Sequence, residues 1–213
     1  AIGSNASLTL RHADLELGQA AVLSGASGFF ENCFFHDYYA TGIPTTYNQP
    51  ILVSEQAASL LVRACHFQNY YETLFRIGVT VIEDSLFEDI TGDGIDFDYA
   101  SAGSVIRRCT LRRGPLINAD AVDLGSSSVG VLVENCLMHD FPFDKGVSVG
   151  ELSSNIVVRG CVMYGLDMGV AVKDSSEAVV VNNTIVDSVN GLKKKKKIPG
   201  QGGGHAVAWN NII

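Results

Sequence analysis

The sequence lacks the features of several common classes of protein. Only 18% of its 213 residues are charged, and the formal net charge of −8 argues against nucleic acid as a partner. No apolar run reaches the roughly 18 residues that a membrane-spanning helix needs. No segment between the apolar stretches shows the period of a helix. These absences, together with 22 glycines that suit many turns, favour an all-β protein.

The cysteines do not form the pattern of a metal site or of a disulfide framework. There is no C-x-x-C pair, and no histidine stands at ligand spacing. Instead, each cysteine has a bulky apolar residue three positions before it and another two positions after it. The series consists of Cys33, Cys65, Cys109, Cys136 and Cys161, continues at Ser85 and Thr184, and reaches the start of an eighth copy at Ile212. This spacing, about 25 residues, indicates an internal repeat.

Each repeat contains three short apolar segments. In the repeat around Cys136, Val131 and Val133 alternate with polar or small residues, and Asn135 is expected to form a bend before the alternation resumes. Residues 146–150 then supply a third strand. Three strands per repeat without an intervening helix predict a right-handed parallel β-helix of about seven to eight turns, in which equivalent residues stack on one another.

The repeat explains why the cysteines recur. Successive cysteines are expected about 4.8 Å apart, which is one strand spacing. Their Cβ vectors would be parallel, which is a poor geometry for a disulfide. We therefore expect buried, stacked, free thiols. Buried thiols are inert, so they are compatible with secretion as well as with a reducing compartment.

The third strands predict a second set of stacked positions. Aligning their opening glycine or small residue, which is Gly42 in the first copy, places Leu74 level with Ile95 and Arg76 level with Phe97. On that register Arg76 and Lys194 would point inward, so we expect the coil to be irregular at these two places.

Two successive third strands carry the pattern D-x-x-D. Asp93 and Asp96 lie on one strand, and Asp120 and Asp123 lie at the same place one turn later. Two charges stacked about 5 Å apart repel by roughly 3 kcal/mol at an effective dielectric of about 20. A bound Ca²⁺ would relieve this repulsion, because Ca²⁺ prefers hard oxygen ligands. Alternatively, one carboxyl has a raised pKa and acts as an acid, or Lys145 pairs with the acids in an exposed ladder.

The sequence also contains a run of five lysines, at positions 193–197. The proline and glycines that follow predict a solvated loop between two turns. Such a run would also attract an acidic polymer, so its role is left open.

The pattern V-x-V-x-N-C-x-F followed by G-V-x-V resembles the pectate-lyase-like superfamily of right-handed β-helices, over nearly the whole chain. The resemblance implies a carbohydrate site on the outer side of the sheet that carries Asp96 and Asp123. Family nine pectate lyases are similar in using D-x-x-D and a neighbouring aspartate to bind Ca²⁺. Their catalytic lysine would stand where this chain has Ser148, so Lys145 is the candidate base.

Two functions therefore stay open. The first is binding or cleavage of an acidic polysaccharide outside the cell or at its surface, with Asp93, Asp96, Asp120 and Asp123 holding Ca²⁺ and Lys145 removing a proton. The second is a non-catalytic structural or adhesion module of a large surface protein. Residues 1–213 are expected to form a single β-helix domain, a fragment or module of a longer protein. We see no capping helix, so flanking domains or partner chains are expected to cover the open ends.

Overall fold

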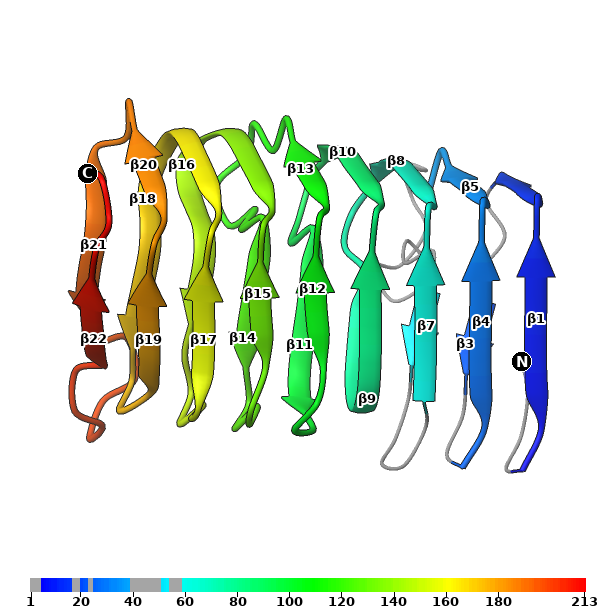
Figure 1. The fold of residues 1–213 in the computed structure, drawn as a ribbon, viewed down its shortest axis with the longest axis horizontal. Coiled ribbons are helices and arrows are strands. Elements are labelled where there is room, and N and C mark those ends of the chain that lie inside the picture. Colours follow the sequence, from blue (N-terminus) through cyan, green and yellow to red (C-terminus); the bar gives the residue numbers. More distant parts are fainter. Residues whose placement is uncertain (1–4, 17–19, 23–24, 39–50, 54–58) are drawn as a thin grey trace.

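The computed structural model describes residues 5–16, 20–22, 25–38, 51–53 and 59–213. The chain winds as a right-handed parallel β-helix of about seven turns, which confirms the predicted fold. Figure 1 shows the strands side by side along one axis, with the two ends of the chain at opposite ends of the coil. Among the described residues there is no helix that is long and apolar enough to cross a membrane.

Each turn contributes strands to three faces. The first face contains β1 (Ser7–Arg11), β4 (Ser27–Glu31), β7 (Ser59–Arg63), the end of β9 (Leu74–Glu83), β12 (Val105–Arg107), β15 (Leu132–Glu134), β17 (Ile156–Arg159), β19 (Glu177–Val181) and β22 (His205–Trp209). The second face contains β2 (Asp14–Glu16), β5 (Phe34–His36), β8 (His66–Tyr70), β10 (Leu86–Ile90), β13 (Thr110–Arg112), the starts of β16 (Leu137–Val149) and β18 (Val162–Lys173), and β20 (Thr184–Val186). The third face contains β3 (Ala20–Val22), β6 (Ile51–Val53), the start of β9, β11 (Ile95–Ala100), β14 (Val122–Gly125), the ends of β16 and β18, and β21 (Asn190–Lys195).

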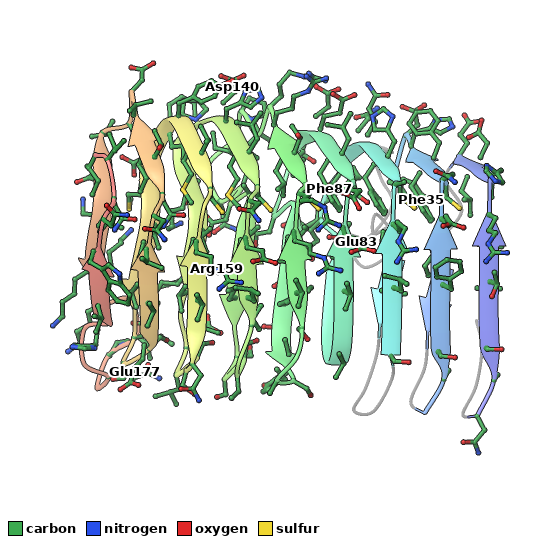
Figure 2. The ribbon with its side chains drawn as sticks, viewed as in Figure 1. Phe35, Glu83, Phe87, Asp140, Arg159 and Glu177 are labelled. Atoms are coloured by element: carbon green, nitrogen blue, oxygen red, sulfur yellow. The ribbon has the colours of Figure 1, made fainter. Side chains whose placement is uncertain are left out.

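The core consists of columns of identical or similar side chains. Phe35, Phe67 and Phe87 stack with ring centroids 4.7 and 4.6 Å apart and nearly parallel planes. Both Phe35 and Phe87, which are labelled in Figure 2, are fully buried. The column continues through aliphatic residues and methionines at the same register. Because each turn covers the apolar surface of the next, one core runs from β4 to β20, while β1 is partly buried and β22 is exposed.

The cysteines are buried and free, as predicted. The prediction that Thr184 continues their column is wrong by one residue. Asn183 holds that place, and its Oδ1 accepts a hydrogen bond from the backbone N–H of Cys161 at 2.9 Å. Asn211, rather than Ile212, takes the next place and accepts a hydrogen bond from the amide of Asn183 at 3.0 Å. Stacked amides satisfy one another, so a buried asparagine column is tolerated where the thiols end.

The bend before each cysteine has the left-handed backbone conformation. Asn135, predicted to form a bend, has φ 54°. The same conformation recurs one turn away in either direction at Arg108 and Gly160. Since Arg108 and Asn135 adopt this φ, it does not by itself require glycine. At Gly160, however, a Cβ would meet the end of the Asn135 side chain, and this contact favours glycine there.

The predicted register of the third face is wrong for its early turns. Leu74 pairs with Asp96 and not with Ile95, so Arg76 stands in the column of Asp98 rather than that of Phe97. Lys194 does pair with Val172, as the alignment requires, but it is exposed rather than buried. Gly42, expected to open the first copy, lies outside the described residues.

Candidate functional site

The outer side of the third face carries charges whose sign changes along the coil. Ile95 pairs with Val122, and Asp96 therefore pairs with Asp123, as predicted. Continuing from Asp123, the column runs through Ser148, Ala171 and Lys193. Acids thus stand over β11 and β14, small residues over β16 and β18, and lysine over β21.

A groove of about 390 Å³ lies beside this face. Its lining combines carboxylates, lysines and apolar side chains from five successive turns. The lining residues are Asp93, Ile117, Asn118, Asp120, Asp123, Phe143, Asp144, Lys145, Asp167, Met168, Lys173, Lys195, Lys196 and Lys197. One groove therefore contains three of the four predicted metal ligands, Asp93, Asp120 and Asp123. It also contains the predicted base, Lys145, and part of the lysine run.

Lys145 is held between two carboxylates. It is 8% exposed, and its Nζ donates to Asp120 Oδ1 at 2.7 Å and to Asp144. Asp144 also accepts the backbone N–H of Asn118 at 2.7 Å. Burial by itself would lower the pKa of Lys145, but Asp120 and Asp144 outweigh it and raise that pKa. The ammonium is therefore charged at neutral pH. Lys145 pairs with the acids as one alternative anticipated, but the pairing is buried and not on an exposed ladder.

Two carboxyls of the groove have raised pKa values. Burial, assisted by hydrogen bonding to Asp144, raises the pKa of Asp120 to about 7 despite the opposing charge of Lys145. Burial also raises the pKa of Asp93 well above its ordinary value, and the charges of Asp120 and Asp123 add to it. Asp93 accepts the backbone N–H of Asp120 at 2.8 Å. A neutral carboxyl relieves the repulsion within the stack without requiring a metal.

Lys173 is a site residue that the sequence did not single out. It is 5% exposed, and its Nζ lies 3.8 Å from Asp123 Oδ1, which is too far for a hydrogen bond. That oxygen and the buried hydroxyl of Ser148 have no hydrogen-bond partner among the described residues. The Lys173 side chain lies across Gly150, where a Cβ would collide with it. The sequence does contain a signal for this contact, because Gly150 stands level with Lys173 of the next turn and leaves room for its side chain.

A bulge in β16 shapes the rim of the groove. Phe141 pairs with Leu166 and Lys145 pairs with Met168, so three residues of β16 lie opposite the single residue 167 of β18. The extra residues place Asp144 against Lys145 and leave Phe143 59% exposed. The wall beside the charged floor is therefore partly apolar.

The predicted Ca²⁺ ligands can be tested against this arrangement. Asp96 and Asp123 stack, but in the part of the chain that the structure describes no three His, Cys, Asp or Glu side chains are grouped so as to hold a metal ion. The Lys145 ammonium contacts Asp120 where a cation would otherwise bind. Ca²⁺ binding by Asp93, Asp96, Asp120 and Asp123 therefore stays a prediction to be measured.

Comparison with solved structures finds the same fold. An alginate lyase from Paenibacillus sp. str. FPU-7 is 13% identical, with a TM-score of 0.60, and the match covers 99% of this chain and 87% of that one. PfbA, a surface adhesin of Streptococcus pneumoniae, is 10% identical with a TM-score of 0.51, covering 95% and 65%. Pectate lyase Pel9A is 10% identical with a TM-score of 0.42, covering 97% and 68%. No curated protein matches the sequence significantly.

The sequence itself matches a family of this architecture. The family described as right handed beta helix region matches residues 51–211, which is well over half of the chain. This match agrees with the parallel pairing of the strands and with the likeness to the alginate lyase. The chain therefore belongs to the right-handed β-helix family.

Proposed function

We propose that this chain binds an acidic polysaccharide in the groove on the third face. The observation that carries the proposal is the incompletely satisfied pair formed by the buried Lys173 and the half-buried Asp123, in a groove that is lined by further lysines. Buried charged groups are normally paired and hydrogen-bonded. A pair held 3.8 Å apart is suited to a ligand that supplies the missing hydrogen bonds.

A sugar provides the complementary groups. Asp123 Oδ1 is closed to solvent, so a ligand hydroxyl reaches it only once the neighbouring side chains shift; the hydroxyl can then donate to Asp123 Oδ1 and accept from Lys173, bridging the two side chains. Lys195, Lys196 and Lys197 line one end of the same groove, where they can pair with carboxylates along the polymer. An acidic polysaccharide presents both groups repeatedly, so it suits this groove better than a neutral polymer.

The proposal is tested by calorimetric titration with oligomers of polygalacturonate and alginate, and with a neutral glucan of similar length. We expect saturable heat with an acidic oligomer, weakened by added salt, and none with the glucan. Equal binding of neutral and acidic oligomers, or no binding of any of them, would refute the proposal.

Cleavage of the bound polymer is a second candidate function. It is favoured by Asp120, because a proton-transfer group works best when its pKa lies near the working pH, and the pKa of Asp120 is about 7. The predicted base, Lys145, would have to leave Asp120 and Asp144 and lose its proton before it could act. A lyase would release unsaturated products that absorb in the ultraviolet, and Asp120→Asn and Lys145→Ala would each abolish that signal.

The non-catalytic alternative differs in one measurable respect. An adhesion module at a cell surface would bind the same polymer without releasing unsaturated product. The fold is shared with an alginate lyase and with a surface adhesin, so it is compatible with both functions and does not choose between them. Binding that persists without product over long incubation would favour adhesion by a module of a longer surface protein.

A further inference from the structure

Two large apolar side chains are exposed at the edge of the groove. Ile117 is 81% exposed and Phe143 is 59% exposed, and both line the same groove as Lys173 and the lysine run. Scattered exposed apolar residues are ordinary on a protein surface. These two differ because they come from successive turns of the coil and border one charged groove.

Their position is built into the backbone. Phe143 lies in the three-residue bulge of β16, which follows from the shifted pairing with β18. Asp144, the next residue, accepts the backbone N–H of Asn118 at 2.7 Å. That hydrogen bond ties the loop carrying Ile117 to the bulge carrying Phe143. The same carboxylate holds Lys145, so the apolar edge and the charged floor are fixed by one side chain.

The two kinds of surface match the two sides of a pyranose ring. A pyranose has an apolar face made of C–H groups and an edge of hydroxyl and carboxyl groups. Aromatic side chains pack well against flat apolar faces, with an electron-rich ring surface that attracts C–H groups. The lysines that line the same groove are complementary in charge to a uronic acid carboxylate. A ring with its carboxylate toward the lysines would turn one face toward Phe143.

We propose that Phe143 and Ile117 form an apolar wall on which one sugar ring of the bound acidic polysaccharide packs, and that this wall positions the ring while the lysines hold its carboxylate. This inference rests on the proposed function. In this arrangement the bulge of β16 recognises the sugar ring. Lys173 and the lysine run recognise its charge.

The single tryptophan of the chain allows a direct test. Trp209 lies on β22 of the first face, so a Trp209→Phe variant has no tryptophan, and adding Phe143→Trp places one at the wall. Titration with a polygalacturonate or alginate oligomer should shift the emission of this tryptophan with the same midpoint as the calorimetric binding curve. Binding seen by calorimetry with an unchanged emission spectrum would overturn the inference.

Affinity measurements provide a second readout. We expect Phe143→Ala to weaken binding about tenfold, which is typical of losing an aromatic packing partner, and Phe143→Tyr to restore most of it. Leu152→Ala is the matched control, because Leu152 is also exposed and apolar but does not line the groove. Circular dichroism of each variant verifies that the coil is intact.

The outcomes separate this inference from the proposed function. If the unmodified chain binds no acidic oligomer, the proposed function fails and the wall fails with it. If Lys173→Met abolishes binding while Phe143→Ala and Leu152→Ala both leave it unchanged, the proposed function stands and the wall alone is refuted.

Discussion

The first and third faces of the coil arrange charge in opposite ways. Along the first face, arginine and glutamate alternate in one column, as Arg11, Glu31, Arg63, Glu83, Arg107, Glu134 and Arg159. Figure 2 labels Glu83 and Arg159 on this face. Along the column of Asp96 on the third face, the signs are segregated, with Asp96 and Asp123 on the earlier turns and Lys193 on the last one.

The difference follows from the strand spacing. Side chains in one column stand about 4.8 Å from their neighbours, so alternating signs let each carboxylate pair on both sides. Buried Glu83 contacts Arg63 at 2.6 Å and Arg107 at 2.6 Å. Segregated signs place like charges next to one another, and that arrangement is unfavourable for the coil by itself. The stability of the coil therefore explains the alternating charges of the first face but not the segregated charges of the third face.

The largest effect is expected on the stability of the first face. Glu83→Gln leaves Arg63, Arg107 and Arg108 without their shared carboxylate, and we expect it to lower the free energy of unfolding by about 2–3 kcal/mol. Denaturant unfolding measures this loss, and Glu134→Gln, with one arginine at 2.7 Å, should lose less. Binding of acidic oligomers should be unchanged, and weaker binding would show that the two faces are not independent.

On the third face, the corresponding change should act on binding. Lys173→Met removes the ammonium while keeping most of the side-chain volume, and we expect affinity for an acidic oligomer to fall about 10-fold to 100-fold. The Lys173–Asp123 contact is long, so unfolding should change little. Arg159→Met on the first face is the matched control. A similar loss of affinity in both variants would mean that net charge, rather than the groove, binds the polymer.

The two faces should also respond oppositely to pH. Burial raises the pKa of Asp120 to about 7, above the ordinary carboxyl value near 3.9. The protonated Asp120 carboxyl therefore favours the folded state at low pH, and this contribution to stability is lost as the pH rises from about 3.9 to about 7. Burial would raise the pKa of Glu83 too, but Arg63 and Arg107 outweigh it and lower that pKa, so its contribution is lost as pH falls. Asp120→Asn should flatten the neutral slope, which for one proton is at most about 1.4 kcal/mol per pH unit. An unchanged neutral slope would contradict the assignment.

Displacing Lys173 without removing it should have a smaller effect. In Gly150→Ala the new methyl group would collide with the Lys173 side chain, and we expect affinity to fall about fivefold as the ammonium moves. In Gly125→Ala, in the preceding turn, the nearest atoms to the new methyl group are carboxylate oxygens of Glu151 and Asp98 at 3.2 and 3.3 Å, and this variant serves as the control. If both variants bind as the unmodified chain does, the path of Lys173 across Gly150 has no role in binding.

Calcium should produce the smallest effect. The carboxylates of the third face do not form a metal-holding group among the described residues, so we expect no saturable heat when Ca²⁺ is titrated into the protein without polysaccharide. Saturable heat that disappears in an Asp96→Asn/Asp123→Asn double variant would instead establish the calcium site that the D-x-x-D pattern predicts.

The sequence was sufficient to predict the coil because the residues that repeat about every 25 positions are the buried ones. Alternating apolar positions set which side of each strand faces the core, and that constraint also stacked Asp96 on Asp123 correctly. The register failed by one residue at Leu74 and at Thr184. At Thr184 the cysteine of the column is replaced by an asparagine, a residue whose polarity gave no sign that it would be buried.

The repeat by itself determined the fold, the free buried thiols and the acidic stack, because these depend on which residues are one turn apart. Only the tertiary structure decided what happens to the charges in the groove. The bulge of β16 brings Asp144 to Lys145, and the Lys173 side chain crosses Gly150 toward Asp123. These contacts depend on inserted residues and on the directions of long side chains, neither of which the period of a repeat specifies.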